Sequence, residues 1–390
     1  MDAFLVLCYT ESRLNFKMAK HKEAYIVAMM RSPVAREMNL SPQELARQVL
    51  QRLFLINHLN PKLTDFFAVG SAISLLNSRQ AKAKEIALLS GMENADCEFV
   101  EKACSSGLVA GYRAAQSIWH EGADFAIGGG LEIMSAVREE TAEALTDHLC
   151  EKKMYQLADE AAVALGISKE EHDKYSAESY RRALENLYNT GPYLTAILVS
   201  GENLQFAYTY DEIVKAHESF ADFEKVSRKK PLDGCNVITY ASSSKPGDGA
   251  AFIAFASPRF VKTNKLRPLA RFVAFARDSG SDPKSFVTRP VGAARKLLEK
   301  TRTPWDKIDV ASVNEAFATT PLYWMRETGM PHEKVNPRGG AIALGHPLGM
   351  SGARIIGEAV HILNQENKNI ALVAVCNARD EGTAAEIHRV

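Results

Sequence analysis

Strand-like apolar runs alternate with helical patterns along the chain, and no other feature constrains its fold as strongly. This alternation is typical of an α/β protein with a buried sheet. Predicted strands span residues 25–29, 125–129, 250–256, 270–276, 308–313 and 370–376, and predicted helices span residues 42–55, 107–119 and 290–300.

Residues 137–227 break this pattern because they are rich in Glu, Lys, Tyr and His and hold a helical run over 168–189. We interpret this segment as an inserted helical cap. The domain prediction is a first α/β half over 18–136 and 228–265, the cap over 137–227, and a second half over 266–390. Met18 is the predicted natural start, because residues 23–28 read as the first core strand.

Charge and cysteine content exclude several classes of protein. Lys plus Arg and Asp plus Glu each number 47, so nothing indicates a nucleic-acid surface. The six cysteines include no C-x-x-C pair, which argues against a disulfide framework or a zinc ribbon and favours a reducing compartment. We therefore expect a cytoplasmic protein, with the mitochondrion as the alternative, and no bound metal. No apolar run reaches the length of a membrane span.

Two segments carry the chemistry. Residues 336–354 place His346 between glycines, which let the backbone approach a ligand closely, and a histidine there can act as a base near neutral pH. Cys104 stands just before a helical pattern, where free N–H groups and the helix dipole favour a thiolate. The alternative for a single cysteine is a buried structural role.

The run Gly-His-Pro-x-Gly-x-Ser-Gly-Ala-Arg around His346 closely resembles the histidine loop of thiolases. Cys-Ser-Ser-Gly-Leu at 104–108 and Asn-Glu-Ala-Phe at 314–317 resemble two further motifs of that family, and residues 128–135 and 239–250 resemble two more segments. The resemblance spans about residues 22–387 in family order. It implies an α/β thiolase-like fold with two similar βαβαβαββ halves, a layered α-β-α-β-α core and an inserted helical cap.

The resemblance implies an acetyl-CoA C-acyltransferase that works by a ping-pong reaction. Cys104, activated by His346, takes the acyl group from a 3-oxoacyl-CoA, and Cys376 exchanges a proton at the reacting carbon or with CoA. Asn314 holds a water near the thioester oxygen, since a neutral amide can fix a water without adding charge. The backbone N–H groups of Cys104 and Ala378 complete the oxyanion hole.

The products implied are acetyl-CoA and a shortened acyl-CoA, or the reverse Claisen condensation, with coenzyme A as co-substrate and no permanently bound cofactor. Ser244 is expected to contact the pantetheine arm of CoA, with an ordinary turn hydroxyl as the alternative, and Arg228 and Phe317 are further candidate CoA contacts. The expected setting is fatty-acid β-oxidation, with its enzymes as partners. Because the segment after Ser135 is shorter than is usual in the family, we expect a homodimer without a tetramerising arm.

The chain departs from the family after Cys376. The family pattern Cys-x-Gly-Gly-Gly-x-Gly becomes Cys-Asn-Ala-Arg-Asp-Glu-Gly at 376–382. Ala378 keeps its N–H but loses easy access to positive φ, at a cost of about 1 kcal/mol where that conformation is needed. Arg379 and Asp380 are expected to form a salt bridge on the rim or to narrow the pocket.

Two rival functions follow. One is a ketoacyl-synthase-like enzyme, which also uses a cysteine at a helix start but with different His and Asn partners. The other is a thiolase-like acyl-CoA-binding protein with low or no turnover, because the C-terminal glycine loop is altered.

Overall fold

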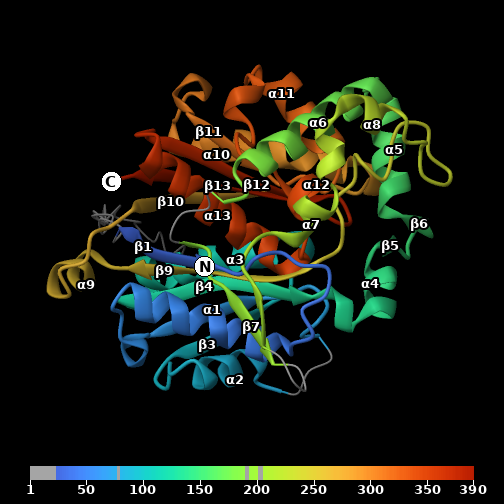
Figure 1. Cartoon of the computed structure of the whole chain (residues 1–390). Coiled ribbons are helices and arrows are strands. Elements are labelled where there is room, and N and C mark those ends of the chain that lie inside the picture. Colours follow the sequence, from blue (N-terminus) through green and yellow to red (C-terminus); the bar gives the residue numbers. More distant parts are fainter. Residues whose placement is uncertain (1–22, 77–79, 189–192, 201–204) are drawn as a thin grey trace, which may run out of the picture.

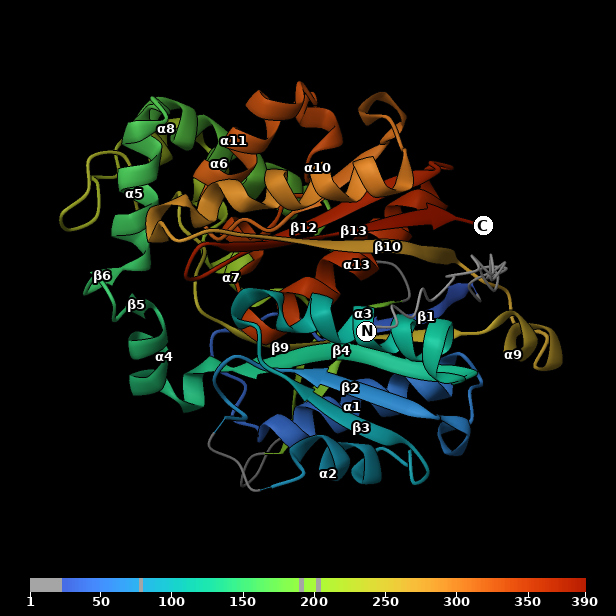
Figure 2. The ribbon, with the colours of Figure 1, turned by 180° about the vertical axis from the view of Figure 1, so that it is seen from behind.

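The computed structural model describes residues 23–76, 80–188, 193–200 and 205–390. The predicted start at Met18 therefore lies outside the described residues. Within them, the main strands form one nine-stranded sheet in the order β11-β12-β13-β10-β1-β9-β4-β2-β3. Figure 1 and Figure 2 show that this sheet is doubled over, so its two halves lie as separate layers with α3 and α13 between them.

The first half follows the predicted βαβαβαββ order. Its strands and helices are β1 (Ala24–Arg31), α1 (Pro42–Ile56), β2 (Phe66–Gly70), α2 (Lys82–Leu89), β3 (Asp96–Val100), α3 (Ser106–Gln116), β4 (Phe125–Ile133) and, after the cap, β9 (Asp248–Ala256). α1 and α2 cover the outer face of this half-sheet with one buried apolar cluster. Of the five strands, β2 and β3 were not predicted.

The second half is shorter than the first. It comprises β10 (Ala270–Ser279), α10 (Arg289–Thr301), β11 (Val310–Val313), α11 (Thr319–Thr328), α12 (Ala341–Leu344), α13 (Leu348–Gln365), β12 (Ile370–Asn377) and β13 (Glu381–Arg389), and α9 (Pro258–Thr263) leads into it. Beyond β11 only an isolated parallel bridge, Ala311 to Val335, takes the place of a further strand. Antiparallel pairing of β1 with β10 joins the halves.

Helix α13 occupies the middle of the molecule and is buried on every side along most of its length. Its glycines allow this: a Cβ on Gly349 of α13 would stand 2.4 Å from the carbonyl oxygen of Leu131 in β4. A Cβ on Gly352 of α13 would stand 2.3 Å from the backbone nitrogen of Leu108 in α3. The small residues of the histidine segment therefore serve packing as well as the site.

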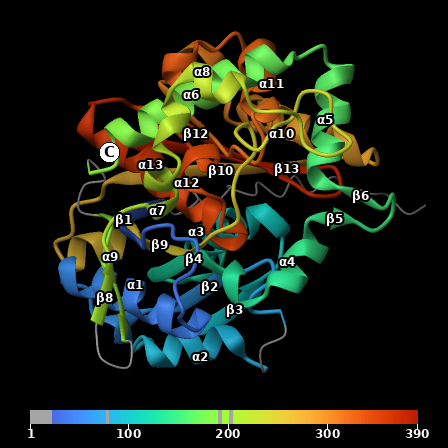
Figure 3. The ribbon, with the colours of Figure 1, turned by 45° about the vertical axis from the view of Figure 1, so that its right-hand side comes forward.

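The cap carries α4 (Arg138–Ala144), β5 (Thr146–Asp147), β6 (Lys152–Lys153), α5 (Met154–Ala164), α6 (Lys169–Glu185), β7 (Ile197–Ser200), β8 (Gln205–Tyr208), α7 (Glu212–Ala216) and α8 (Phe223–Ser227). It is mostly helical, as predicted, with two small hairpins. Figure 3 shows α4 beside the first half, α5 rising along one edge, α6 and α8 over the second half, and the β7–β8 hairpin returning beside α1. Where each unit begins and ends stays a prediction.

The sequence of α6 accounts for both its start and its buried face. Ser168 accepts a hydrogen bond from the N–H of Glu171, whose carboxylate returns to the N–H of Ser168, so the helix start is fully capped. Its inner face packs Tyr175, Tyr180 and Ala183 against α12 and α8. None of the helices in the described ranges is long and apolar enough to cross a membrane.

Candidate active site

Cys104 lies in a short 3₁₀ turn, Ala103–Ser105, directly before α3. Ala103 adopts φ 44°, a left-handed conformation that is unusual for alanine, and so turns the chain sharply before the cysteine. The residue as a whole is partly exposed, and its side chain packs against the apolar cluster of Ala72, Ile73, Met134 and Leu348. Leu348 follows His346 by two residues, so the cysteine turn and the histidine loop are in contact.

Cys376 lies near the end of β12 and is buried. The hydroxyl of Thr320 donates to its Sγ at 3.9 Å. The next residue, Asn377, accepts a hydrogen bond from the backbone N–H of Ser105 at 2.7 Å, which ties the strand of Cys376 to the turn of Cys104. The hydroxyls of Ser105 and Thr383 share a second bond of 2.6 Å. The structure thus brings the two predicted cysteines together.

His346 is held in one tautomer by its loop. The hydroxyl of Ser351 donates to the carbonyl of Pro347 at 2.9 Å, so its oxygen accepts from Nδ1–H of His346 at 2.6 Å. Nε2 then carries the lone pair and accepts from the side-chain amide of Asn314 at 3.3 Å. Gly345 adopts φ 96° just before the histidine, a conformation in which glycine is strongly favoured.

Asn314 follows β11, and its N–H donates to the carbonyl of Ala374 in β12 at 2.8 Å. This bond places Asn314 beside the strand that carries Cys376. The side chain is fully buried, and its Oδ1 has no hydrogen-bond partner among the described residues. A buried carbonyl oxygen of this kind is available to a water or a ligand donor.

The three titratable groups of the site are neutral at pH 7. Burial, followed by the charge of Arg354, lowers the pKa of His346 to about 3. Burial raises the pKa of Cys376 to about 11, and burial together with the neighbouring Cys376 raises the pKa of the Cys104 thiol well above its usual range. Burial therefore acts against the thiolate that the helix start is predicted to favour at Cys104.

The altered glycine loop is braced by an ion pair that the sequence did not reveal. Arg379 and Asp380 both adopt φ 60°, whereas Ala378 does not have a positive φ, so the strain predicted at Ala378 falls on its two neighbours. Asp380 is buried and accepts from Arg289 Nη2 at 2.7 Å and from the N–H of Asp282 at 3.0 Å. Arg379 is exposed. The predicted salt bridge between Arg379 and Asp380 is replaced by one between Asp380 and Arg289.

An open cleft of about 620 Å³ lies beside this loop. Ala103 and Leu348 line it next to Cys104, and Ala378 and Arg379 line it next to Cys376. Met154 of the cap closes one side. The cleft is therefore shared by the cysteine turn, the histidine helix, the altered loop and the cap.

The predicted CoA contacts are only partly assembled. Ser244 is half-buried, its N–H donates to the carbonyl of Ala316 at 3.0 Å, and Phe317 bridges to Ser243, so these two predicted residues are neighbours. Phe317 is buried and packs edge-on against Phe286. Arg228 is exposed after α8, and among the described residues its ion pair is with Glu224 at 3.3 Å. No described contact joins Arg228 to the other two.

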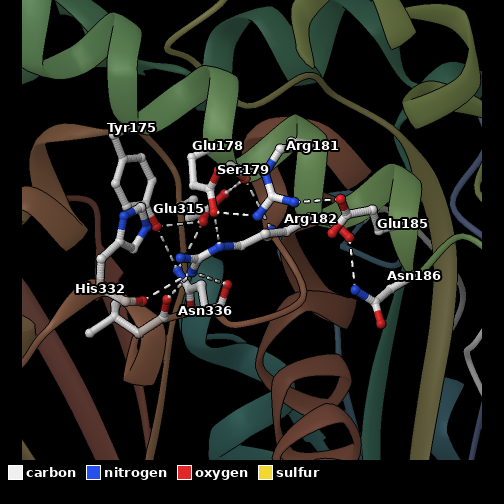
Figure 4. Close-up of polar contacts among 12 residues, drawn as sticks. Tyr175, Glu178, Ser179, Arg181, Arg182, Glu185, Asn186, Glu315, His332 and Asn336 are labelled. Carbon is white, nitrogen blue, oxygen red and sulfur yellow. Dashed lines mark hydrogen bonds and ion pairs between the residues drawn. The ribbon is translucent and has the colours of Figure 1, made fainter. Parts of the chain in front are cut away.

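Glu315 anchors the cap to the site, a role the sequence did not reveal. It is fully buried and accepts from Tyr175 at 2.6 Å and Ser179 at 2.8 Å on α6, as Figure 4 shows. It also accepts from the Asn336 amide at 2.9 Å and the N–H of Ile342 at 3.1 Å. One carboxylate therefore joins the cap helix, the end of β11 and the histidine loop.

Lys245 is a second such link. Its ammonium donates to the Tyr180 hydroxyl at 2.6 Å, to the carbonyl of Ser243 at 2.8 Å and to that of Ile342 at 3.4 Å. Its own carbonyl accepts the N–H of His346 at 2.8 Å. Burial lowers the pKa of Lys245 to about 7, although the charge of Glu315 acts in the opposite direction. In the sequence, the only sign of this link is the position of a lysine within the segment of residues 239–250.

The chain matches two protein-family models, one over each half. Residues 24–258 match the family model described as "Thiolase, N-terminal domain" and residues 266–389 match "Thiolase, C-terminal domain". A probable acetyl-CoA acetyltransferase of Dictyostelium discoideum is 30% identical over 357 residues, which cover 85% of this chain and 84% of that protein.

Two solved structures extend the comparison. The acetyl-CoA acetyltransferase of Bacillus anthracis superposes with a TM-score of 0.88 at 27% identity, covering 95% of this chain and 99% of that one. Human mitochondrial 3-ketoacyl-CoA thiolase in complex with CoA superposes with a TM-score of 0.86 at 26% identity, covering 95% and 98%. Fold and relatives define the class, a CoA-dependent acyltransferase enzyme. The chain belongs to the thiolase family.

Proposed function

We propose that this protein cleaves 3-oxoacyl-CoA by thiolysis, or runs the reverse Claisen condensation, through an acyl-enzyme on Cys104. The observation that supports the proposal is that the segments carrying Cys104, Cys376 and His346 meet beside one cleft, which their neighbours Ala103, Ala378 and Leu348 line. The turn of Cys104 is bonded to the residue after Cys376, and Nε2 of His346 is the unprotonated ring nitrogen. Its resting neutrality suits a base that takes a proton only when the thiol attacks.

The first half-reaction follows from these positions. Sγ of Cys104 bonds to the 3-oxo carbon while its proton passes to Nε2 of His346. The bond between the second and third carbons then breaks, and its electron pair takes a proton from Cys376, which releases acetyl-CoA. In the second half-reaction the thiol of a free CoA gives its proton to the Cys376 thiolate and attacks the thioester carbon. The bond from that carbon to Sγ of Cys104 breaks, His346 returns its proton to Sγ, and the shortened acyl-CoA leaves.

Stabilisation of the developing oxyanion is assigned to two groups. Oδ1 of Asn314 has no partner among the described residues, which supports a bound water there. The backbone N–H groups of Cys104 and Ala378 are the proposed second element, since replacing glycine by alanine keeps the donor. Ser244 and Phe317 are proposed to hold the CoA arm, and Arg228 would need to turn from Glu224 to join them.

The assembly and the setting belong to the same proposal. We propose a homodimer without a tetramerising arm, a cytoplasmic or alternatively mitochondrial location, and action beside the other enzymes of β-oxidation. Among the described residues the only ordered structure between α4 and α5 is the small β5–β6 hairpin, which is short for an arm. Light scattering should give twice the chain mass, and a stable tetramer or a monomer would contradict the dimer.

The decisive experiment is thiolysis of acetoacetyl-CoA and of a panel of 3-oxoacyl-CoAs from short to long chains. Wild-type protein should consume CoA and release acetyl-CoA, and mass spectrometry after substrate addition should find the acyl group on Cys104. Cys104→Ser should lose turnover. Cys97→Ser is the matched control, because Cys97 is a partly exposed thiol away from the site. Full turnover in Cys104→Ser would refute the assignment.

A further inference from the structure

Three arginines from separate parts of the chain line one small cavity. Arg31 lies at the end of β1, Arg338 lies in the loop before α12, and Arg354 lies on α13. Each is more than nine-tenths buried, with exposed fractions of 3%, 8% and 3%. The cavity measures about 20 Å³, close to the space that a single water-sized sphere occupies.

The buried charges around the cavity do not balance. Arg31 is paired with Asp211 through two bonds of 2.7 and 2.8 Å, and Arg354 is paired with Glu358 at 2.6 Å. Both carboxylates are buried and line the same cavity. Arg338 reaches outward to Glu366 at 3.4 Å, a partly exposed carboxylate that also pairs with a lysine. Three buried guanidinium groups therefore face two buried carboxylates.

Each arginine also has at least one fully buried nitrogen without a partner. Nε of Arg31, Nη1 of Arg338 and Nε of Arg354 have no hydrogen-bond partner among the described residues. Buried N–H groups without partners are costly, and those of a charged guanidinium more so than neutral ones. The rest of the wall is mixed, because Leu187 and Leu344 are apolar whereas Asn186 and Tyr193 are polar.

We propose that this cavity is a halide site, which chloride occupies under ordinary buffer conditions. An anion fits because guanidinium groups offer only donors and because the buried groups leave one positive charge in excess. A monatomic anion matches a space of about 20 Å³, whereas phosphate and sulfate carry four oxygens around the central atom and need more room. A water molecule would meet the donors but would leave the excess charge unbalanced.

Bromide is the probe, because its anomalous scattering identifies it directly. Crystals grown in sodium bromide should show an anomalous peak within hydrogen-bond reach of the three guanidinium groups. In solution, bromide or chloride should raise the melting temperature by about 2 °C over sodium gluconate at equal ionic strength, since a ligand bound only by the folded state stabilises it.

Arg338→Gln should abolish the halide-specific rise. Arg295→Gln is the matched control: it also removes one positive charge, from an exposed ion pair with Glu327, and should keep the rise. No anomalous peak in the cavity, which would mean water only, overturns the proposal. So does a peak without any halide-specific rise in the wild type, which would mean binding at crystal concentration only. Should Arg338→Gln fail to fold, the two wild-type measurements still decide.

Discussion

Removing Arg289 should destabilise the protein far more than removing its partner Asp380. Arg289→Met leaves the Asp380 carboxylate, which is 1% exposed, without its counter-ion, and stranding a buried charge costs about 3–5 kcal/mol. Asp380→Gly leaves Arg289 about a quarter exposed and still paired with Asp278 at 3.2 Å. It also relieves about 1 kcal/mol of strain at φ 60°. We therefore expect Asp380→Gly to cost only about 1–2 kcal/mol.

Urea unfolding of the two single variants and the double variant measures this directly. The double variant should cost about as much as Asp380→Gly alone, because no unpaired charge remains once both partners are gone. Arg379→Gly is the control within the same loop. It has the same φ but an exposed side chain, so it should stabilise the protein by up to about 1 kcal/mol. Additive losses, or a loss in Arg289→Met below that in Asp380→Gly, would refute the reasoning.

Three further predictions concern the site. Asn314→Ala should lower kcat about ten- to a thousand-fold, the range for one oxyanion donor, and unchanged steady-state kinetics would exclude its role. The pKa of Lys245 is about 7 in the folded protein and near 10.5 in the unfolded chain. Between these pH values, the unfolded chain therefore binds a proton at Lys245 that the folded protein does not. Wild-type stability should rise with pH relative to Lys245→Met by up to about 1.4 kcal/mol per unit from pH 7 to 10, and a difference that stays constant with pH would contradict this. Glu132→Gln should lower the free energy of unfolding in urea by about 2–4 kcal/mol. The carboxylate accepts hydrogen bonds from Ser71, from the N–H groups of residues 72–74 and from the N–H of Gly349, and the amide nitrogen of glutamine would face some of these donors. A near-neutral effect would show that the amide can turn to satisfy them.

Sequence reasoning missed β13, whose apolar pattern is interrupted by a buried polar residue. β13 begins in the altered loop and contains Glu386, which is fully buried. Its carboxylate accepts from Thr301 at 2.6 Å and from Thr303 at 2.7 Å, both at the end of α10. A buried, satisfied glutamate breaks the apolar pattern by which a strand is predicted, and no local signal reveals its distant partners.

The same distinction holds within the site. Cys104, His346 and Asn314 stand in contiguous motifs, so the sequence identified them as candidates and the fold brings their segments together. The protonation states were not predictable, since burial by the whole fold sets them. The same is true of the pair between Asp380 and Arg289, which are 91 residues apart, and of the burial of Lys245 against Tyr180 and Phe220 of the cap.

The resting neutrality of the site has a consequence for how it can work. A thiolate on Cys104 and an imidazolium on His346 would be two separate charges in a buried site. Burial disfavours both charged forms, which is why the pKa of Cys104 is raised and the pKa of His346 is lowered. Charge therefore has to develop together with the bond to the substrate, when the oxyanion and its donors are present to receive it. The fixed tautomer of His346, held by Ser351, leaves the base nitrogen ready without charging it beforehand. Glu315 and Lys245 hold the cap against the histidine loop. The position of the base nitrogen of His346 therefore also depends on contacts with the cap, outside the sequence motifs.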